Sequence, residues 1–138
     1  MKSRVFIYLC DESRDIRQRV FVEEQGFEEE FDTTDKRSIH VVVYDDEGRA
    51  VGTGRMFAGE DGVYSIGRVA VEKSARGRGV GECVMDRLVD ECRRHHAKKV
   101  QLWSQEQAVG FYEKTGFVAD GQTMVEQGVM HMRMEMCI

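Results

Sequence analysis

In its middle the chain reads Arg76-Gly77-Arg78-Gly79-Val80-Gly81, a run of glycine and arginine between two regular elements. Before this run, Val63–Val71 has the β-branched content of a long strand, with Gly67 near its centre. After it, Val80–His96 carries apolar residues at four-residue spacing and is the clearest helix of the sequence. The run therefore forms a loop that leads from a strand into the N-terminus of a helix.

The composition of this loop favours binding of a diphosphate. Glycine lets backbone N–H groups approach an oxyanion closely, the helix N-terminus adds the positive end of its dipole, and the arginines add charge. Two familiar phosphate loops do not fit, because no Lys follows Gly81 as in a P-loop and Glu82 stands where a dinucleotide-binding loop has its third Gly. A flexible surface connection is the alternative interpretation.

The glycine within the preceding strand points to a second binding feature. Gly67 in mid-strand is typical of a bulge or of a close backbone approach. A bulge would splay this strand from its neighbour and leave N–H and C=O groups that could pair with an amide-bearing ligand. Pantetheine has two amides and is joined to a diphosphate, so a splayed strand beside a phosphate loop suits coenzyme A.

The remaining pattern predicts an α/β (α+β) fold in one domain over residues 1–138, with a mixed, largely antiparallel sheet flanked by helices. The expected order is β-α-α-β-β-β-α-β-α-β-β. Phe27 and Phe31, at helical spacing, anchor the second helix in the acidic stretch Glu23–Asp35. The other elements are strands at Ser3–Leu9, Ile39–Tyr44, Ala50–Phe57, Val100–Ser104, Phe117–Ala119 and Met130–Met136, and helices at Asp15–Val22 and Gln107–Lys114.

Composition narrows the functional class. With 41% hydrophobic and 33% charged residues, the sequence is typical of a soluble globular protein, and its net charge of −5 argues against a nucleic-acid binder. We expect no membrane segment or signal peptide, a cytoplasmic location, and reduced thiols at all 4 cysteines. We also expect no metal site, because the cluster of Cys92, His95 and His96 lacks a second pair of ligands at zinc-finger spacing.

Two motifs carry a resemblance to a known family. Arg76-x-x-Gly79-x-Gly81 resembles the Q/R-x-x-G-x-G/A signature of the GNAT N-acetyltransferase superfamily, and Phe111-Tyr112-Glu113-Lys114-Thr115-Gly116-Phe117 resembles its F-Y-x-K-x-G-F segment. The stretch from Val20 to Gln25 and the position of His131 are similar to the small ElaA-like branch. The resemblance covers nearly the whole chain and implies the GNAT fold.

The resemblance also implies a cofactor and roles for particular residues. It predicts an acetyl-CoA-dependent N-acetyltransferase in which Tyr112 protonates the leaving thiolate. Gln105 stands where the family often has Asn, so its contact with the cofactor is an open point. The strand residues expected to pair with pantetheine are Val69, Ala70 and Val71, and those expected around the diphosphate are Arg76, Gly77, Arg78, Gly79, Val80, Gly81 and Glu82.

The acceptor and the general base are predicted from charge. An amine with a pKa near 10.4 must lose a proton before it attacks a thioester, and a carboxylate or His is the usual base. The candidates are Glu24 and His131. The acidic stretch contains Glu23, Glu24, Glu28, Glu29, Glu30, Asp32 and Asp35 without a basic residue among them, which favours a small cationic amine as acceptor. A solvated acidic face and a structural histidine are the alternative interpretations.

Two other functions stay open at this point. The chain could be a non-catalytic acyl-CoA sensor or interaction module, or it could acetylate a protein N-terminus or lysine instead of a small molecule. We expect direct transfer in a ternary complex, because no cysteine sits in a motif that points to an acyl-enzyme. The sequence leaves open whether the protein forms a homodimer.

Overall fold

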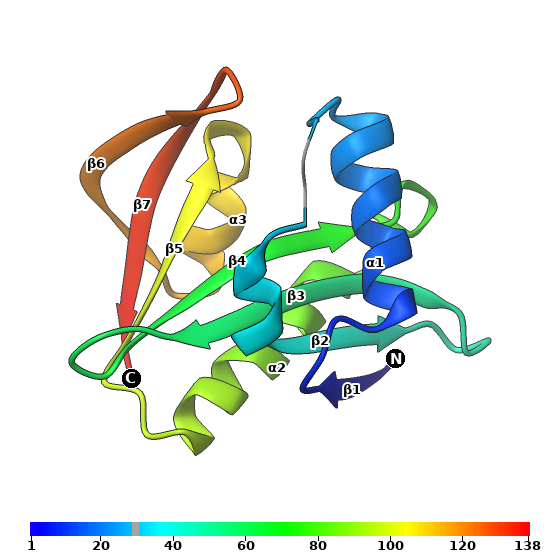
Figure 1. Ribbon diagram of the computed structural model, residues 1–138, viewed down its shortest axis with the longest axis horizontal. Coiled ribbons are helices and arrows are strands. Elements are labelled where there is room, and N and C mark those ends of the chain that lie inside the picture. Colours follow the sequence, from blue (N-terminus) through cyan, green and yellow to red (C-terminus); the bar gives the residue numbers. More distant parts are fainter. Residues whose placement is uncertain (29–30) are drawn as a thin grey trace.

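The computed structural model describes residues 1–28 and 31–138, and within them seven strands form one sheet in the order β1-β2-β3-β4-β5-β7-β6 (Figure 1). All neighbouring strands are antiparallel except β4 and β5, so the expected mixed, largely antiparallel sheet is confirmed. The strands are β1 (Lys2–Phe6), β2 (Ile39–Tyr44), β3 (Ala50–Ala58), β4 (Val63–Val71), β5 (Lys99–Gln105), β6 (Val118–Glu126) and β7 (Val129–Cys137).

The parallel pair at the centre of the sheet separates soon after it begins. Residues 63–65 of β4 pair with residues 99–101 of β5, and the rest of the two strands is not paired with each other. Figure 1 shows the two strands diverging from a common corner, with β5 continuing beside β7 and β4 beside β3. The sheet therefore has a V-shaped opening between its two halves.

Helices cover both faces of the β2–β4 half of the sheet. On one face lies α2 (Val80–Arg94), and on the other lies α1 (Asp11–Arg17), which continues as the π-helical segment η1 (Gln18–Glu24). Three successive residues of β3 show the two faces: a Cβ atom on Gly52 or Gly54 would lie within 2.6–3.0 Å of side chains of α2, whereas Thr53 hydrogen-bonds Ser13 of α1 at 2.7 Å. The absence of side chains at these glycines brings α2 close to the sheet.

Two short 3-10 turns, η3 (Lys73–Ala75) and η4 (Glu106–Ala108), precede α2 and α3 (Val109–Lys114). Among the described residues no helix is long and apolar enough to cross a membrane. The buried side chains between α2 and the sheet form the main core, and Ile16, Val20, Phe21 and Ala70 form a second cluster under α1 and η1.

The N-terminal helices differ from the prediction. The first helix starts earlier than expected, at Asp11, and its continuation η1 ends at Glu24. The expected second helix in the acidic stretch is wrong for the described residues: Gly26, with φ +77°, ends η1, and Phe27 turns back to stack on Phe21 at 6.3 Å between ring centroids. A 3-10 turn, η2 (Thr33–Arg37), follows, and Glu29 and Glu30 lie outside the described residues.

The C-terminal hairpin is longer than expected. Strand β6 runs through Asp120 and Gly121, where the sequence indicated a turn, because the register shift between Ala119 and Thr123 absorbs these residues as a bulge. Gly128, which the sequence also indicated as a turn residue, does lie in the turn. Gln127 and Gly128 have φ values of 49° and 75°, both positive, as a tight type I′ hairpin turn requires. At the other end of the chain, β1 stops at Phe6 instead of Leu9.

Candidate active site

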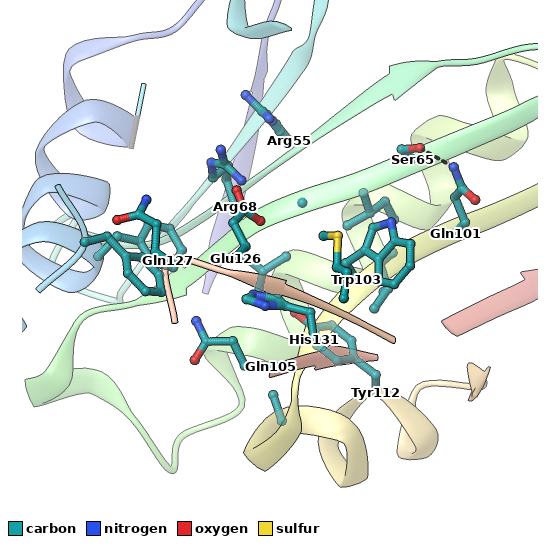
Figure 2. Close-up of a pocket in the computed structure, with 18 of the residues that line it drawn as sticks. Arg55, Ser65, Arg68, Gln101, Trp103, Gln105, Tyr112, Glu126, Gln127 and His131 are labelled. Atoms are coloured by element: carbon teal, nitrogen blue, oxygen red, sulfur yellow. Dashed lines mark hydrogen bonds between the residues drawn. The ribbon is translucent and has the colours of Figure 1, made fainter. Parts of the chain in front are cut away.

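A cavity of about 480 Å³ lies in the opening between β4 and β5. Its wall combines aromatic side chains from the η1 end and from β3 and β5 with polar side chains from several strands. Figure 2 shows Arg55 and Arg68 on one side of the cavity and Tyr112 on the opposite side. The lining aromatic residues other than Tyr112 are Phe21, Phe27, Phe57 and Trp103.

A bulge in β4 shapes this cavity. Arg55 of β3 pairs with Gly67 and Thr53 pairs with Ala70, so two residues of β4, Arg68 and Val69, face a single residue of β3. Arg68 has φ 54°, which is rare for a residue with a side chain. The bulge predicted from Gly67 is thus present one residue further along, and a Cβ atom on Gly67 would meet no atom within 4 Å. The glycine leaves open space in the cavity wall.

The loop before α2 presents backbone donors. Gly77 and Gly79 have φ values of 78° and 80°, which explains why both are glycine. From Gly77 to Glu82 the amide N–H groups donate to no acceptor in the described chain, and the first that does is that of Cys83, 3.1 Å from the oxygen of Gly79. Several donors and the positive end of the α2 dipole are therefore available to an anion.

Gly81, the third glycine of the loop, is needed for a different structural reason. A Cβ atom there would lie 3.1 Å from the ring of Phe111, the neighbour of Tyr112 on α3. Gly81 therefore allows α3 to pack closely against the start of α2. The loop thus contains two glycines that shape it, Gly77 and Gly79, and one that positions the helix bearing Tyr112.

The side chain of Arg76 forms hydrogen bonds within the protein, and Glu24 is one of its partners. Its guanidinium donates to both carboxylate oxygens of Glu24 at 2.6 Å and to the carbonyl oxygen of Val71 at 3.0 and 3.1 Å. The hydrogen bonds from Arg76 lower the pKa of the Glu24 carboxyl below its ordinary value. Glu24 is not among the residues that line the cavity. The structure therefore separates this base candidate from Tyr112.

Tyr112 and His131 both line the cavity. Nδ1 of His131 lies 2.9 Å from the carbonyl oxygen of Val129. A carbonyl oxygen only accepts, so Nδ1 carries the hydrogen and Nε2 carries the lone pair of the neutral ring. Burial raises the pKa of Tyr112 to about 12, so its phenol stays protonated at neutral pH. The site thus offers a proton acceptor on β7 and a proton donor on α3.

Gln105 also lines the cavity, at the end of β5. It donates a 2.9 Å hydrogen bond to the side-chain oxygen of Gln25 and accepts a 2.6 Å bond from Gln107. These amides form a polar bridge from η4 across to the end of η1. Gln105 therefore contacts the wall that faces it, in addition to any contact with a cofactor.

Two carboxylates of the acidic stretch are held by arginines. Asp35 is buried and accepts hydrogen bonds of 2.8 Å from both Arg17 and Arg55. Asp32 accepts from Arg55 at 2.7 Å and from Arg68 at 3.2 Å. None of the described carboxylates between positions 23 and 35 lines the cavity. The described part of the acidic stretch therefore contributes no carboxylate to the cavity wall.

Sequence reasoning missed most of the residues in the cavity wall. Phe21, Phe27 and Trp103 come from separate elements, and no local motif joins them. Strand periodicity does give one signal, because Gln101, Trp103 and Gln105 alternate with the buried residues of β5 and so share the cavity face. An exposed tryptophan in the middle of such a strand, here 37% exposed, indicates a binding surface.

Comparisons with known proteins agree with this geometry. Residues 11–138 match the family described as "Acetyltransferase (GNAT) domain". The uncharacterized N-acetyltransferase YjcF of Bacillus subtilis (strain 168) is 38% identical over 122 residues, which cover 86% of this chain and 86% of YjcF. Escherichia coli ElaA has a TM-score of 0.85 at 24% identity over 98% of both chains, and an acyl-CoA N-acyltransferase from Pseudomonas aeruginosa has a TM-score of 0.83 at 25% identity over 99% of both chains.

The similarity to ElaA is one of fold, whereas the family match and YjcF extend to the sequence itself. Together they confirm the resemblance carried by the glycine–arginine loop and the segment around Tyr112, and they identify an acyltransferase. The chain belongs to the GNAT family of acetyltransferases.

Proposed function

We propose that this protein moves an acetyl group from acetyl-CoA to the primary amine of a small molecule, by direct attack within a ternary complex. The observation that carries the proposal is the arrangement around the V-shaped opening. A loop with unengaged amide donors lies at the end of β4, and the cavity beside β4 contains Tyr112 and His131. Such a site can hold the thioester and the amine together, which removes much of the entropic barrier to transfer.

The cofactor would be held largely by the backbone. Val69, Ala70 and Val71 offer main-chain groups on the side of β4 that faces away from β3, where β5 no longer pairs with them. The diphosphate would lie at the loop from Gly77 to Glu82, whose N–H groups have no acceptor in the described chain. Open space around Gly77, where a Cβ atom would meet no other atom within 4 Å, fits such a group. Arg76 would stabilise the loop and add positive charge beside it.

His131 is the proposed general base. An alkylamine is mostly protonated at neutral pH and becomes nucleophilic only after it loses a proton. Nε2 of His131 holds the lone pair that can accept this proton, directly or through one water, because Nδ1 is engaged with Val129. Glu24 is a weaker candidate because Arg76 holds its carboxylate outside the cavity lining.

Tyr112 is the proposed proton donor. Attack on the thioester creates an oxyanion, which a backbone N–H of β4 could stabilise, and collapse expels the thiolate. The environment that raises the pKa of Tyr112 to about 12 also disfavours a thiolate charge at the same place, so a donor is needed there. The phenol stays protonated and can supply that donor as negative charge develops on sulfur.

A cytosolic location accords with this proposal. Cys10, Cys83, Cys92 and Cys137 are all free thiols, as expected in a reducing compartment. Enzymes that use acetyl-CoA as acyl donor need access to the pool of this thioester, and that pool is present in the same compartment.

The test is a thiol-release assay with acetyl-CoA and a panel of small amines, lysine peptides and N-terminal peptides. We expect turnover with at least one small amine and initial-rate patterns in which both substrates bind before product leaves. Turnover with peptides but with no small amine would mean that the acceptor is a protein. Calorimetric binding of acetyl-CoA without turnover of any amine would favour the sensor alternative, and no binding at millimolar concentration would overturn the proposal.

A further inference from the structure

We infer that the acceptor carries an anionic group, a carboxylate or a phosphate, in addition to its amine, and that Arg68 binds this group. The inference rests on the proposed function, because it concerns the second substrate of the same site. It reverses the expectation of a cationic acceptor.

The bulge turns Arg68 toward the cavity. All five residues from Ser65 to Val69 contribute to the cavity wall, but Ile66 and Val69 also pack against the core under α2, whereas Ser65 and Gly67 lie opposite Phe57 and Arg55 of β3, on the other face of the sheet. Strict alternation would send the residue after Gly67 to the α2 side, because successive side chains of a strand point to opposite faces. Arg68 instead lines the cavity beside Gly67 and pairs with Asp32 on the α1 side. The inserted residue therefore places two successive positions of one strand on the same face.

The conformation of Arg68 has an energetic cost. At φ 54° the Cβ atom of Arg68 crowds the following carbonyl oxygen, so this backbone conformation is strained for a residue with a side chain. Gly67, next to it, has no positive φ, so the strained position falls on the arginine although a glycine adjoins it. Strained non-glycine positions of this kind cluster at ligand sites, and an observed outlier is a reason to look for a function.

The surroundings hold Arg68 in place for a ligand. Asp32 bridges Arg68 to Arg55, and Asp35 in turn ties Arg55 to Arg17, whose side chain is 1% exposed. A guanidinium has five N–H donors in a planar fork, so an arginine that pairs with a protein carboxylate can also bind a ligand carboxylate. Gly67, the residue before Arg68 in the cavity wall, leaves open space where a side chain would otherwise lie.

The charges of the cavity wall agree with an anionic ligand. Among the described residues, the charged side chains that line it are those of Arg55, Arg68 and Glu126. Glu126 lies on the exposed end of β6, whereas both arginines lie on the β3–β4 side and are buried or half-buried. Tyr112 and His131 belong to other elements, and Figure 2 shows Tyr112 across the cavity from the arginines. An amine could therefore lie at His131 while an acidic group of the same molecule contacts Arg68.

The experiment compares amines that differ only in the acidic group. Matched pairs are 4-(aminomethyl)benzoate against benzylamine and phenylalanine against phenethylamine, with 4-(aminomethyl)phenylphosphonate separating phosphate-like from carboxylate binding and spermidine representing cationic acceptors. For wild type we expect at least a tenfold higher kcat/KM for the acidic member of a pair. In Arg68→Gln this preference should fall to near unity, mainly through KM, and Arg68→Lys should retain part of it.

Arg19→Gln is the matched control. It removes the same charge from an exposed arginine that pairs with Glu72 and does not line the cavity, so the preference should stay. Arg68→Gly keeps the left-handed backbone without strain and replaces Arg68→Gln if that variant folds poorly. Equal rates for both members of every pair, faster turnover of spermidine, or an unchanged preference in Arg68→Gln would each overturn the inference.

Failure of the proposed function gives a different result. If no amine is acetylated although acetyl-CoA binds, catalysis has failed and the ligand preference is read by calorimetry with the same acid and amine pairs. Tighter binding of the acids to wild type than to Arg68→Gln would still support the anionic site. Equal binding to both proteins would contradict it independently of turnover.

Discussion

The two sides of the V-shaped opening, which we propose bind the cofactor and the acceptor, offer different groups to a ligand. On one side, the end of β4 and the loop before α2 offer backbone N–H groups, and glycines at 77 and 79 give the loop its shape. On the other side, the acceptor wall consists of side chains from η1, β3, β4, β5 and the β6–β7 hairpin. Main-chain groups stay the same when side chains are substituted, so they suit a cofactor that all variants of the protein share. A wall of side chains can acquire a new acceptor specificity by substitution without a change of fold.

The ion pairs that stabilise the two sides differ in how deeply they are buried. The cofactor side needs few side chains, and its ion pair between Glu24 and Arg76 is partly exposed, at 32% and 41% of the side-chain surface. The acceptor side rests on the buried cluster of Arg17, Asp35 and Arg55. We therefore expect side-chain substitutions to have large effects at the reacting groups and in this cluster, and small effects at the exposed pair.

The largest effect is expected at Tyr112, where the two sides meet. Replacing Tyr112 by Phe keeps the packed ring against Phe111 and Phe117 and removes the phenol proton. General acid–base groups contribute roughly 10²–10⁴-fold to rate, so kcat should fall by about that factor with little change in the dissociation constant of acetyl-CoA. Steady-state kinetics and calorimetry on the same preparation check this.

The pH–rate profile sharpens the assignment. Because the pKa of Tyr112 is raised to about 12, its deprotonation should cause no loss of rate below about pH 11 in wild type. The ascending limb at lower pH should disappear or move in His131→Gln, since that variant removes the proposed base. A Tyr112→Phe enzyme with full turnover, or an ascending limb that His131→Gln leaves in place, would remove the corresponding residue from the mechanism.

The sequence predicted the loop that offers backbone groups better than the wall of side chains. Gly77, Gly79 and Gly81 lie within five residues, so a local motif was enough to predict the loop, the helix start and the family. Periodicity and turn residues predicted the order of helices and strands along the chain, and Gly67 with the family resemblance predicted the opening. A backbone site is encoded where the chain needs unusual φ values or close packing, and glycine makes such positions visible.

The acceptor side was harder to predict because its residues meet only after folding. Glu24 looked like a base from its position, but its partner Arg76 lies 52 residues away in the sequence. Phe27 and Phe31 suggested a helix, yet Gly26 ends η1 and Phe27 packs back on Phe21. Periodicity indicates which residues are buried. It does not indicate which residue, distant in the sequence, forms an ion pair with a given charged side chain.

The second largest effect is expected for Asp35→Asn, which tests the support of the acceptor side. The variant leaves Arg17 and Arg55, with side chains 1% and 6% exposed, without the carboxylate that both contact. Removing one partner of a buried ion pair costs about 3–5 kcal/mol, so the free energy of unfolding should fall by that order. Urea denaturation measures it, and Asp46→Asn at an exposed carboxylate is the control that should leave the midpoint unchanged.

The same carboxylate makes stability depend on pH. Burial opposes its ionisation, but hydrogen bonds from Arg17 and Arg55 outweigh burial and hold the pKa of Asp35 well below its usual range. A depressed pKa in the folded state stabilises the protein fully above the unfolded value near 3.9, and this contribution is lost as pH falls through the folded value. Asp35→Asn should therefore flatten the loss of stability below about pH 4, and an unchanged acid transition would contradict the role of this cluster.

A smaller effect is expected on the cofactor side for Gly79→Ala. Gly79 has φ 80° at the position before α2, where an alanine would be strained by about 1–2 kcal/mol. We expect the free energy of unfolding to fall by this amount and the dissociation constant of acetyl-CoA to rise about tenfold, since the amide donors would be displaced. Gly110→Ala, in α3 without a positive φ and with open space at its Cβ position, is a matched control. Unchanged binding would mean that the loop does not hold the diphosphate.

The smallest effect is expected for Glu24→Gln, and it tests whether the two sides are as separate as the structure indicates. Exposed ion pairs contribute about 0–1 kcal/mol, so the free energy of unfolding should change by less than about 1 kcal/mol. The ascending limb of the pH–rate profile and kcat should both stay unchanged, because Arg76 holds Glu24 outside the cavity lining. If kcat fell a hundredfold or the limb moved, Glu24 would have to leave Arg76 during turnover and reach the amine. Movement at the cofactor loop would then change the acceptor wall, and a description of the site as a backbone cradle beside an independent side-chain pocket would fail.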